Sequence, residues 1–292
     1  MEFKRLGLKD LSLCRPYFNL ITDYQTCDYT VGGTFMWRDY FKMEYAIEQG
    51  VLYTRLYNEK GERFYNLPIG KPLGECLDKL KFQALIDGEP LKFCTVPESM
   101  LQSITALCEC SYYEQEIFAD YLYLSEDLIS LRGKKFSPQR NLISQFNRNN
   151  PNYSAVTIDG QNVQLIKEFL DKNFCVSNAK SDFEREEIIK TKEALDNLPN
   201  FNFVGLALKS EDKIIGFSLG EIVGDVLFYH VEKADKTVKG AYKKLCNLFV
   251  NEYAGKVKFV NREEDMGDLG LRKSKLDYNP VKILKKYVVE IK

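Results

Sequence analysis

The sequence predicts a mixed α+β fold built from two halves of similar organisation. Hydrophobic residues make up 45% of the 292-residue chain and charged residues 28%, which is the balance of a packed globular protein. Aromatic residues reach 13%, and this favours strands over a plain bundle of helices. Strand-like stretches interleave with helical spacings up to residue 125, and the same order of elements begins again after Pro151.

The first half, 1–125, is predicted to form one domain. Residues 1–24 indicate a strand that leads into a helix, with an apolar run from Tyr17 to Tyr24. Trp37, the single tryptophan, lies in an apolar stretch and is interpreted as a core anchor. The remaining elements are strands over 43–47 and 51–56 joined by a Gly-containing hairpin turn, a strand over 64–70, a helix over 73–87, a strand over 91–96, a helix over 98–106 and a strand over 121–124.

Residues 126–150 are predicted to be a basic connecting segment. Five basic residues lie between 132 and 148, and no acidic residue follows Asp127 in this segment. Positive charge at a helix start suits a phosphate group or an RNA backbone. Lys134, Lys135 and Arg140 are therefore candidate ligands for a phosphate-bearing donor. Alternatively, the segment is a solvated basic helix.

The second half, 151–292, is predicted to form another domain. Its elements are a strand over 153–158, helices over 163–174 and 183–198, strands over 203–208, 214–221 and 227–233, a helix that opens at Gly240-Ala241-Tyr242, and a strand over 257–260. Glu221 ends one of these strands, while His230 and Glu232 lie two residues apart on the next. Side chains two residues apart in a strand point to the same face.

A charged, glycine-punctuated stretch, 261–275, follows the last of these strands. Loops that a rigid scaffold displays carry much of protein chemistry. Arg272 and Lys275 are three residues apart and share a face if this part is helical. Alternatively, the charges of the stretch pair with one another and only hold the loop in shape.

Charge and cysteine usage exclude several classes of function. The net charge is −1, so no overall basic field attracts nucleic acid or an anionic membrane. The single histidine and the eight cysteines, none in a C-x-x-C pair, predict no metal site. We expect reduced thiols, no signal peptide and a cytoplasmic location. No apolar run approaches the roughly 20 residues that span a bilayer, so we expect no transmembrane segment.

One part of the second half resembles the GNAT acyltransferase fold. The residues on which this resemblance rests are the hairpin K-I-I-G-F-S-L-G at 213–220, the strand ending in H-V-E-K-A-D at 230–235, and the turn and helix that follow. In that fold a loop before a helix receives the pyrophosphate of coenzyme A on backbone N–H groups. The corresponding loop here is 236–241, in which Lys236 and Ala241 match the family pattern and Lys239 replaces its first glycine.

Three longer stretches, 127–146, 230–235 and 260–287, are similar to the C-terminal catalytic domain of phosphatidylglycerol lysyltransferases and the bacterial family related to it. This resemblance covers essentially the whole chain. It implies tandem GNAT-like domains, each with a mixed, mostly antiparallel sheet flanked by helices. It also implies transfer of an acyl or aminoacyl group, with aminoacyl-tRNA or acyl-coenzyme A as co-substrate and no tightly bound cofactor.

Acyl transfer to an amine or hydroxyl of a small molecule, lipid headgroup or peptide needs a base, an oxyanion donor and a cationic surface for the donor. The candidates for the chemistry are Glu221, His230, Glu232, Arg262 and Glu263. The candidates for the donor phosphates are Lys134, Lys135, Arg140, Lys233, Lys236, Gly240, Arg272 and Lys275. His230 ordinarily titrates near neutrality, although a lone histidine is also compatible with a structural role. The alternative function is a non-catalytic module that binds tRNA, a nucleotide or a charged metabolite.

Overall fold

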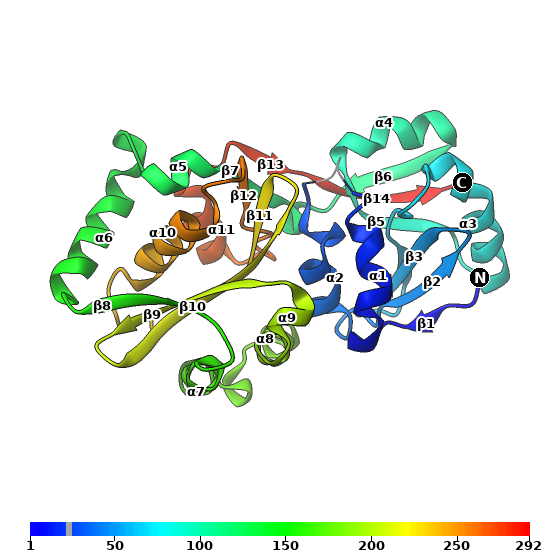
Figure 1. Cartoon of the computed structure of the whole chain (residues 1–292). Helices are drawn as coiled ribbons and strands as arrows, with labels where there is room; N and C mark the ends of the chain where they lie inside the picture. Colours follow the sequence, from blue (N-terminus) through cyan, green and yellow to red (C-terminus); the bar gives the residue numbers. More distant parts are fainter. Residues whose placement is uncertain (22–24) are drawn as a thin grey trace. The chain divides into compact units, whose positions relative to one another are not determined.

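The computed structural model describes residues 1–21 and 25–292, which form two compact units (Figure 1). The first unit comprises Met1–Asp120, Glu264–Met266 and Leu284–Lys292, and the second comprises Tyr121–Glu263 and Gly267–Ile283. Each unit contains a seven-stranded sheet with helices, so the predicted tandem α+β organisation is confirmed. Residues 22–24 of the predicted apolar run from Tyr17 to Tyr24 lie outside the described residues.

The first unit is built on a sheet of order β1-β2-β3-β4-β5-β14-β6. Its strands are β1 (Lys4–Arg5), β2 (Glu44–Glu48), β3 (Val51–Tyr57), β4 (Arg63–Tyr65), β5 (Lys92–Pro97), β6 (Cys110–Glu114) and β14 (Lys286–Ile291). Its helices are α1 (Leu11–Phe18), α2 (Val31–Trp37), α3 (Leu73–Asp87) and α4 (Glu98–Leu107). The predicted hairpin is present, with Glu44 opposite Arg55 in β2 and β3.

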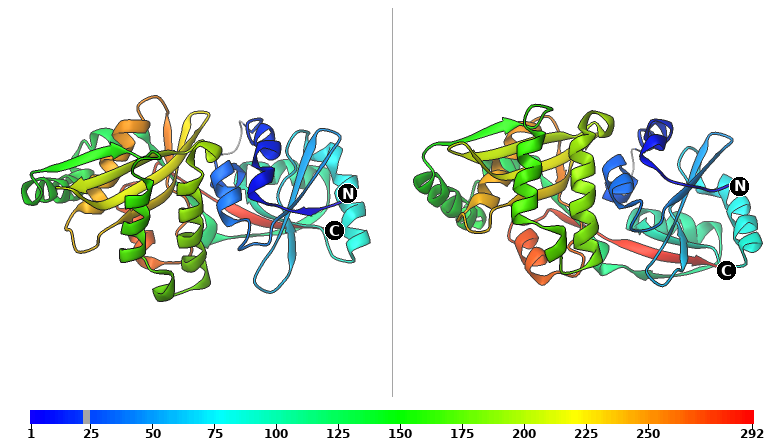
Figure 2. Two further views of the ribbon diagram at one scale, coloured as in Figure 1. Left: turned by 60° about the horizontal axis from the view of Figure 1, so that its bottom comes forward. Right: turned by 90° about the horizontal axis from the view of Figure 1, so that it is seen from below.

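The second unit has a sheet of order β13-β7-β12-β11-β10-β9-β8. Its strands are β7 (Asp120–Leu124), β8 (Tyr153–Thr157), β9 (Val204–Ser210), β10 (Lys213–Val223), β11 (Val226–Ala234), β12 (Phe259–Asn261) and β13 (Lys282–Leu284). Its helices are α5 (Ser125–Ser130), α6 (Ser137–Asn149), α7 (Val163–Asn173), α8 (Asp182–Asp196), α9 (Leu198–Phe201), α10 (Ala241–Tyr253) and α11 (Leu269–Leu276). Figure 2 shows α7 and α8 together on one side of this sheet.

The two units repeat one structural device. In the first, β4 and β5 pair in parallel and α3 connects them; in the second, β11 and β12 pair in parallel and α10 connects them. A parallel pair requires such a crossover, whereas the hairpins elsewhere in the sheets are antiparallel. The similar rhythm of elements in the two halves of the sequence therefore reflects a repeated β-α-β crossover within mostly antiparallel sheets.

The units differ from the predicted division into 1–125, 126–150 and 151–292. Strand β7 pairs with β12, and this pairing places residues 121–124 in the second unit. The segment 126–150 also belongs to the second unit, because Phe136 and Phe146 are fully buried in its core. The C-terminal strand β14 instead pairs with β5 and β6 of the first unit, where it completes the sheet.

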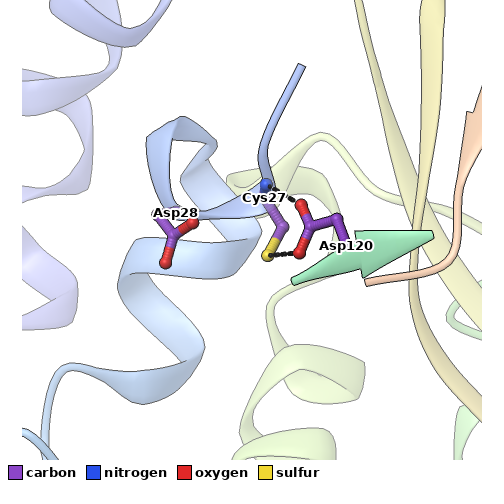
Figure 3. A group of neighbouring side chains, drawn as sticks. All are labelled: Cys27, Asp28 and Asp120. Carbon is purple, nitrogen blue, oxygen red and sulfur yellow. Dashed lines mark hydrogen bonds between the residues drawn. The ribbon is translucent and has the colours of Figure 1, made fainter. Parts of the chain in front are cut away.

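A buried lysine anchors β14 within the first unit. The ammonium of Lys286, which is 0% exposed, lies 2.6 Å from Asp28 Oδ2 and 2.7 Å from Asp120 Oδ1. The Sγ of Cys27 is 3.5 Å from the same nitrogen. Asp120 also accepts the backbone N–H of Cys27 at 2.8 Å, as Figure 3 shows. Cys27, Asp28 and Asp120 have the spacing of a metal site, but the Lys286 ammonium lies among their ligand atoms, where a metal ion would bind.

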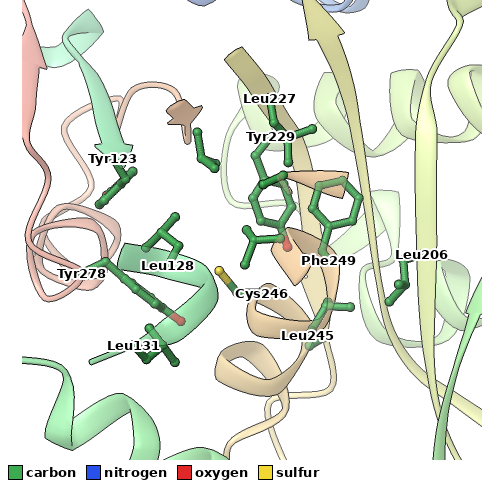
Figure 4. Close-up of a cluster of buried hydrophobic side chains, with 14 of the residues drawn as sticks. Tyr123, Leu128, Leu131, Leu206, Leu227, Tyr229, Leu245, Cys246, Phe249 and Tyr278 are labelled. Carbon is green, nitrogen blue, oxygen red and sulfur yellow. The ribbon is translucent and has the colours of Figure 1, made fainter. Parts of the chain in front are cut away.

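The core of the second unit forms around α10. Leu245 and Phe249 of this helix are fully buried, and the Phe249 ring stacks on Tyr229 of β11 at 4.5 Å between ring centroids (Figure 4). Burying a Leu or Phe side chain contributes about 1.5–3 kcal/mol. Helix α10 therefore holds β11 in place, and β11 carries two of the predicted catalytic residues.

Trp37 differs from its predicted role as a core anchor. Phe35 is fully buried on α2, whereas Trp37 at the end of that helix is half-buried and lines a cavity of the first unit. No helix in the described part of the chain is both long enough and apolar enough to cross a membrane.

Candidate functional site

A bulge in β11 organises the predicted catalytic residues. Leu219 of β10 lies opposite Val231, but Glu221 lies opposite Phe228, so β11 has one extra residue opposite Gly220. Gly220 permits the close approach, since a Cβ there would lie 2.3 Å from the Phe228 carbonyl oxygen. Bulges re-aim side chains and occur beside functional sites. Here the bulge lies at Tyr229 and His230.

His230 is held between two carboxylates. Its Nε2 lies 2.9 Å from Glu221 Oε1 and its Nδ1 lies 2.5 Å from Glu263 Oε1. The side chain is 2% exposed, and its ring packs against Phe203 with ring centroids 5.1 Å apart and the two planes tilted by 31°. Glu263 reaches the ring from a backbone with φ of 58°, a left-handed conformation that is uncommon outside glycine.

The two carboxylates keep His230 protonated. Burial alone lowers the pKa of His230, but the charges of Glu263 and Glu221 and their hydrogen bonds overcome it and raise the pKa to about 10. At neutral pH both ring nitrogens therefore donate protons, and neither offers a lone pair. This arrangement favours a structural imidazolium over a general base at His230.

Arg262 forms the second part of the network. Its Nη2 donates to Glu232 Oε2 at 2.5 Å, and its guanidinium carbon lies 4.7 Å from the Tyr278 ring centroid and 5.6 Å from that of Tyr229. Cations on aromatic faces gain about 0.5–2 kcal/mol. The ammonium of Lys275 donates to the Arg262 carbonyl at 2.6 Å. Arg262 is thus a buried cation, 7% exposed, that Glu232 and Lys275 hold in position.

Glu232 keeps one oxygen available. Its Oε2 accepts from Arg262, while no side chain in the described part of the protein donates to its Oε1. The side chain is 16% exposed. Of the five predicted catalytic residues, Glu232 therefore has the geometry that best suits a base: a carboxylate oriented by arginine with a free acceptor atom.

Lys243 of α10 adds a cation that the sequence alone did not single out. Its ammonium lies 4.2 Å from the centroid of the Tyr278 ring that Arg262 also contacts. Burial lowers the pKa of Lys243 first, and the positive charge of Arg262 lowers it further, against the opposing effect of Glu232. Only the tertiary structure brings α10 beside β12, since 19 positions separate the two cations in the chain.

Two predicted donor-binding residues are engaged elsewhere in the second unit. Lys233 pairs with Glu187 of α8 at 2.6 Å. Lys275 is 6% exposed and holds the Arg262 carbonyl as described above. Arg272 precedes Lys275 on α11, so the helix that would align the two residues is present. Asp268 caps this helix by accepting the Leu271 N–H at 2.7 Å.

Two of the three candidate cations in the basic segment 134–140 make structural contacts, and the third is exposed to solvent. Lys135 pairs with Asp127 at 2.8 Å. Arg140 donates to the carbonyl oxygens of Leu131 and Gly133, and so braces the turn between α5 and α6. Lys134 is exposed, and no ion pair engages it in the described part of the chain. Of the three, Lys134 is the cation that remains free for a phosphate.

The predicted phosphate loop, 236–241, packs against α6. Gly240 has a φ of 83°, and a Cβ at this position would lie 2.5 Å from the Leu142 carbonyl oxygen. Lys236 in the same loop is exposed. The tertiary structure thus brings the loop and the basic helix, two of the predicted donor-binding regions, side by side. Gly240 permits this close packing because it has no Cβ.

Gly240→Ala is expected to destabilise the protein by about 2–4 kcal/mol. The new Cβ would clash with the Leu142 carbonyl oxygen, and alanine is also strained in the left-handed backbone conformation of this position. Chemical denaturation followed by circular dichroism measures the change. Gly255→Ala is the matched control, since no atom lies within 4 Å of its Cβ position, and it should change stability by no more than about 0.5 kcal/mol. Equal effects of the two substitutions would contradict this packing role.

The structure therefore assembles two linked groups in the second unit: Glu221–His230–Glu263, and Glu232–Arg262 with Lys243, Tyr278 and Lys275. The cleft predicted between these groups and the basic segment stays a prediction. Lys134 and Lys236 lie on the segments that adjoin α6.

Comparisons with known proteins identify relatives of this chain. A conserved protein of unknown function from Bacteroides thetaiotaomicron is 30% identical, with full coverage of both chains and a TM-score of 0.89. An uncharacterised protein of Mycoplasmoides gallisepticum is 24% identical over 188 residues, which cover 62% of this chain and 60% of that relative, less than two thirds of its length.

More distant structures share the fold. The L-PGS structure from Bacillus licheniformis has a TM-score of 0.60 at 13% identity and covers 86% of this chain and 84% of that one. FemX has a TM-score of 0.61 at 10% identity and covers 100% and 98%. The family model "Phosphatidylglycerol lysyltransferase, C-terminal" matches residues 20–290. The chain therefore belongs to the family of phosphatidylglycerol lysyltransferase C-terminal domains.

Proposed function

We propose that the protein is an aminoacyl transferase that takes its aminoacyl group from aminoacyl-tRNA and passes it to an amine or hydroxyl acceptor. Family membership over residues 20–290 carries this proposal. It is supported by the exposed cations Lys134 and Lys236, which lie on two segments that each adjoin α6, since exposed cations suit a phosphate backbone. Acyl-coenzyme A is the less favoured donor, because Lys239 and the packed Gly240 interrupt the pyrophosphate loop.

In the proposed reaction Glu232 accepts the proton of the attacking amine or hydroxyl through its free oxygen. The nucleophile bonds to the ester carbonyl carbon, and the bond to the ribose oxygen breaks. Lys243 and Arg262 supply positive charge while the carbonyl oxygen carries negative charge. The ribose hydroxyl leaves with a proton, which Glu232 returns. His230 holds Glu221 and Glu263 in place and takes no part in proton transfer.

Glu232→Gln and Lys243→Met are expected to lower aminoacyl transfer or donor hydrolysis by about 100-fold and 10-fold, without loss of fold. The assay follows radiolabelled aminoacyl-tRNA with and without a mixture of amine acceptors. Glu252→Gln is the matched control, because Glu252 is an exposed carboxylate on α10, and it should retain full activity. Full activity in both test variants would contradict the assigned roles.

A second function is favoured by the burial of His230 and Arg262 in ion pairs, which suits a module that binds without catalysis. It predicts that deacylated tRNA raises the melting temperature, and that the shift fades steeply between about 50 and 200 mM salt. Binding of this kind with no transfer or hydrolysis of any donor would favour the module. A shift with coenzyme A alone would contradict tRNA as the ligand of both functions.

A further inference from the structure

The first unit encloses a cavity that the proposed transfer chemistry does not use. Its volume is about 340 Å³, enough for a molecule of amino-acid size. The side chains of Cys27, Asp28 and Glu264 line one part, next to the buried Lys286. Trp37, half-buried at the end of α2, lines another.

Asp28 presents an acceptor to this cavity. Its Oδ2 lies 2.6 Å from the Lys286 ammonium, and none of the ion pairs among the described residues involves its Oδ1. Asp28 and Asp120 pair with the same Lys286 ammonium. Figure 3 shows these two carboxylates beside Cys27. A carboxylate so placed can accept hydrogen bonds from a second cation.

Asn66 presents a donor. Its side chain is 6% exposed and lines the cavity, and its Oδ1 accepts only a weak contact from the Cys94 thiol at 3.6 Å. No described residue accepts a hydrogen bond from its Nδ2. The amide N–H groups of Asn66 can therefore donate to an oxygen of a ligand in the cavity.

Gln115 supplies a second donor. Its Oε1 accepts the Thr95 N–H at 2.9 Å, which leaves its Nε2 for the cavity that both residues line. Thr95 has a φ of 49°, a strained conformation for a β-branched residue. Strand β5 has a bulge here, since Tyr287 pairs with Val96 but Val289 pairs with Phe93. Strain and bulges of this kind concentrate at binding sites.

Five aromatic rings form part of the remaining wall, together with the apolar side chains of Met43, Leu56 and Val288 and the polar side chains of Asn58, Lys60 and Glu62. The rings that line it are Trp37, Phe41, Phe64, Tyr113 and Phe118. Aromatic faces accommodate an apolar body and also attract an adjacent cation. The cavity therefore combines a carboxylate acceptor, two amide donors and an apolar wall.

We propose that this cavity is a binding site for a small primary amine that also carries a carbonyl oxygen on an apolar body, the chemistry of an amino-acid amide or ester. The ammonium group pairs with Asp28, the carbonyl oxygen accepts from Asn66 and Gln115, and the apolar body packs on the aromatic wall. A metal ion is the weaker alternative, because the Lys286 ammonium already occupies the centre of the Cys27–Asp28–Asp120 group. The proposal does not depend on transferase activity.

Trp37 offers a built-in readout, since it is the single tryptophan of the chain and lines the cavity. The intact protein is titrated with L-phenylalaninamide, and tryptophan fluorescence excited near 295 nm is followed, with calorimetry as a second measurement. We expect saturable binding and a fluorescence change. Two related probes each lack one group: N-acetyl-L-phenylalaninamide lacks the ammonium and 3-phenylpropylamine lacks the carbonyl.

Each missing group should weaken binding by about 10-fold or more. Asp28→Asn should remove the preference for the charged probe, and Asn66→Leu should remove the preference for the carbonyl. Glu75→Gln and Gln102→Leu, exposed positions on α3 and α4, are the matched controls and should leave binding unchanged. If a variant unfolds, the three probes on the unaltered protein still decide the question. No saturable binding, or equal binding of all three probes, would overturn the proposal.

Discussion

Lys286→Met is expected to lower the free energy of unfolding by about 3–5 kcal/mol, because it leaves buried carboxylates without their cation. Lys286 is fully buried and pairs with Asp28 and Asp120, of which Asp120 is also fully buried. Methionine has a similar length, so the cost is one of charge and not of a large cavity. Chemical denaturation followed by circular dichroism at neutral pH measures the loss.

The neighbouring residue provides the control. Lys285 is 44% exposed and pairs with Glu114 at the surface, so Lys285→Met should cost no more than about 1 kcal/mol. Burial raises the pKa of Asp28 despite the attraction of Lys286. The ionised carboxylate is thus the form that the fold disfavours, and the penalty of Lys286→Met should shrink as the pH falls and Asp28 takes up a proton. A penalty that is equal for both lysines, or independent of pH, would contradict the charge cluster.

His230→Gln is expected to cost about 3–5 kcal/mol at neutral pH, because glutamine removes the positive charge between Glu221 and Glu263. The pKa of His230 is raised from 6.5 to about 10 in the folded protein. A group with a raised pKa contributes stability that is complete below its unfolded pKa and is lost as the pH rises through the folded value. The contribution of His230 should therefore be complete below about pH 6.5 and disappear toward pH 10, with roughly 5 kcal/mol as its upper bound.

Two measurements check this result. The difference in unfolding free energy between the unaltered protein and His230→Gln is determined from pH 6 to 10, and it should fall steadily over that range. The chain has one histidine, so its ring proton resonances are unambiguous in NMR spectra, and they should show no titration near pH 6.5. A ring that titrates near 6.5 would restore His230 as a candidate base.

Local pattern predicted most of the elements. The helix expected over 73–87 corresponds to α3 (Leu73–Asp87), and the strand expected over 214–221 lies within β10 (Lys213–Val223). These segments have strong periodicity, and periodicity is a local property. Strand β14 was not anticipated, because its place depends on β5 and β6, strands that precede it by more than 170 positions.

In the charged stretch 261–275, too, the local features were predictable from the sequence and the long-range contacts were not. Its composition and its place after a strand were readable from the sequence. The shared face of Arg272 and Lys275 was expected only on the condition of a helix, and α11 meets that condition. Which charge pairs with which was not readable. Only the bulge in β11 and the backbone of Glu263 bring that carboxylate to His230, and only the packing of α10 brings Lys243 beside Tyr278.

By itself the sequence determined the mixed α+β class, the repeated order of elements and the residues from which the charged network is drawn, because periodicity and motif resemblance are properties of short stretches. The tertiary structure alone decided that His230 is a protonated brace, that Glu232 retains a free oxygen and that Lys286 fills a would-be metal site. The physical reason is that protonation and pairing depend on burial and on charges within a few ångströms, and those neighbours come from distant parts of the chain.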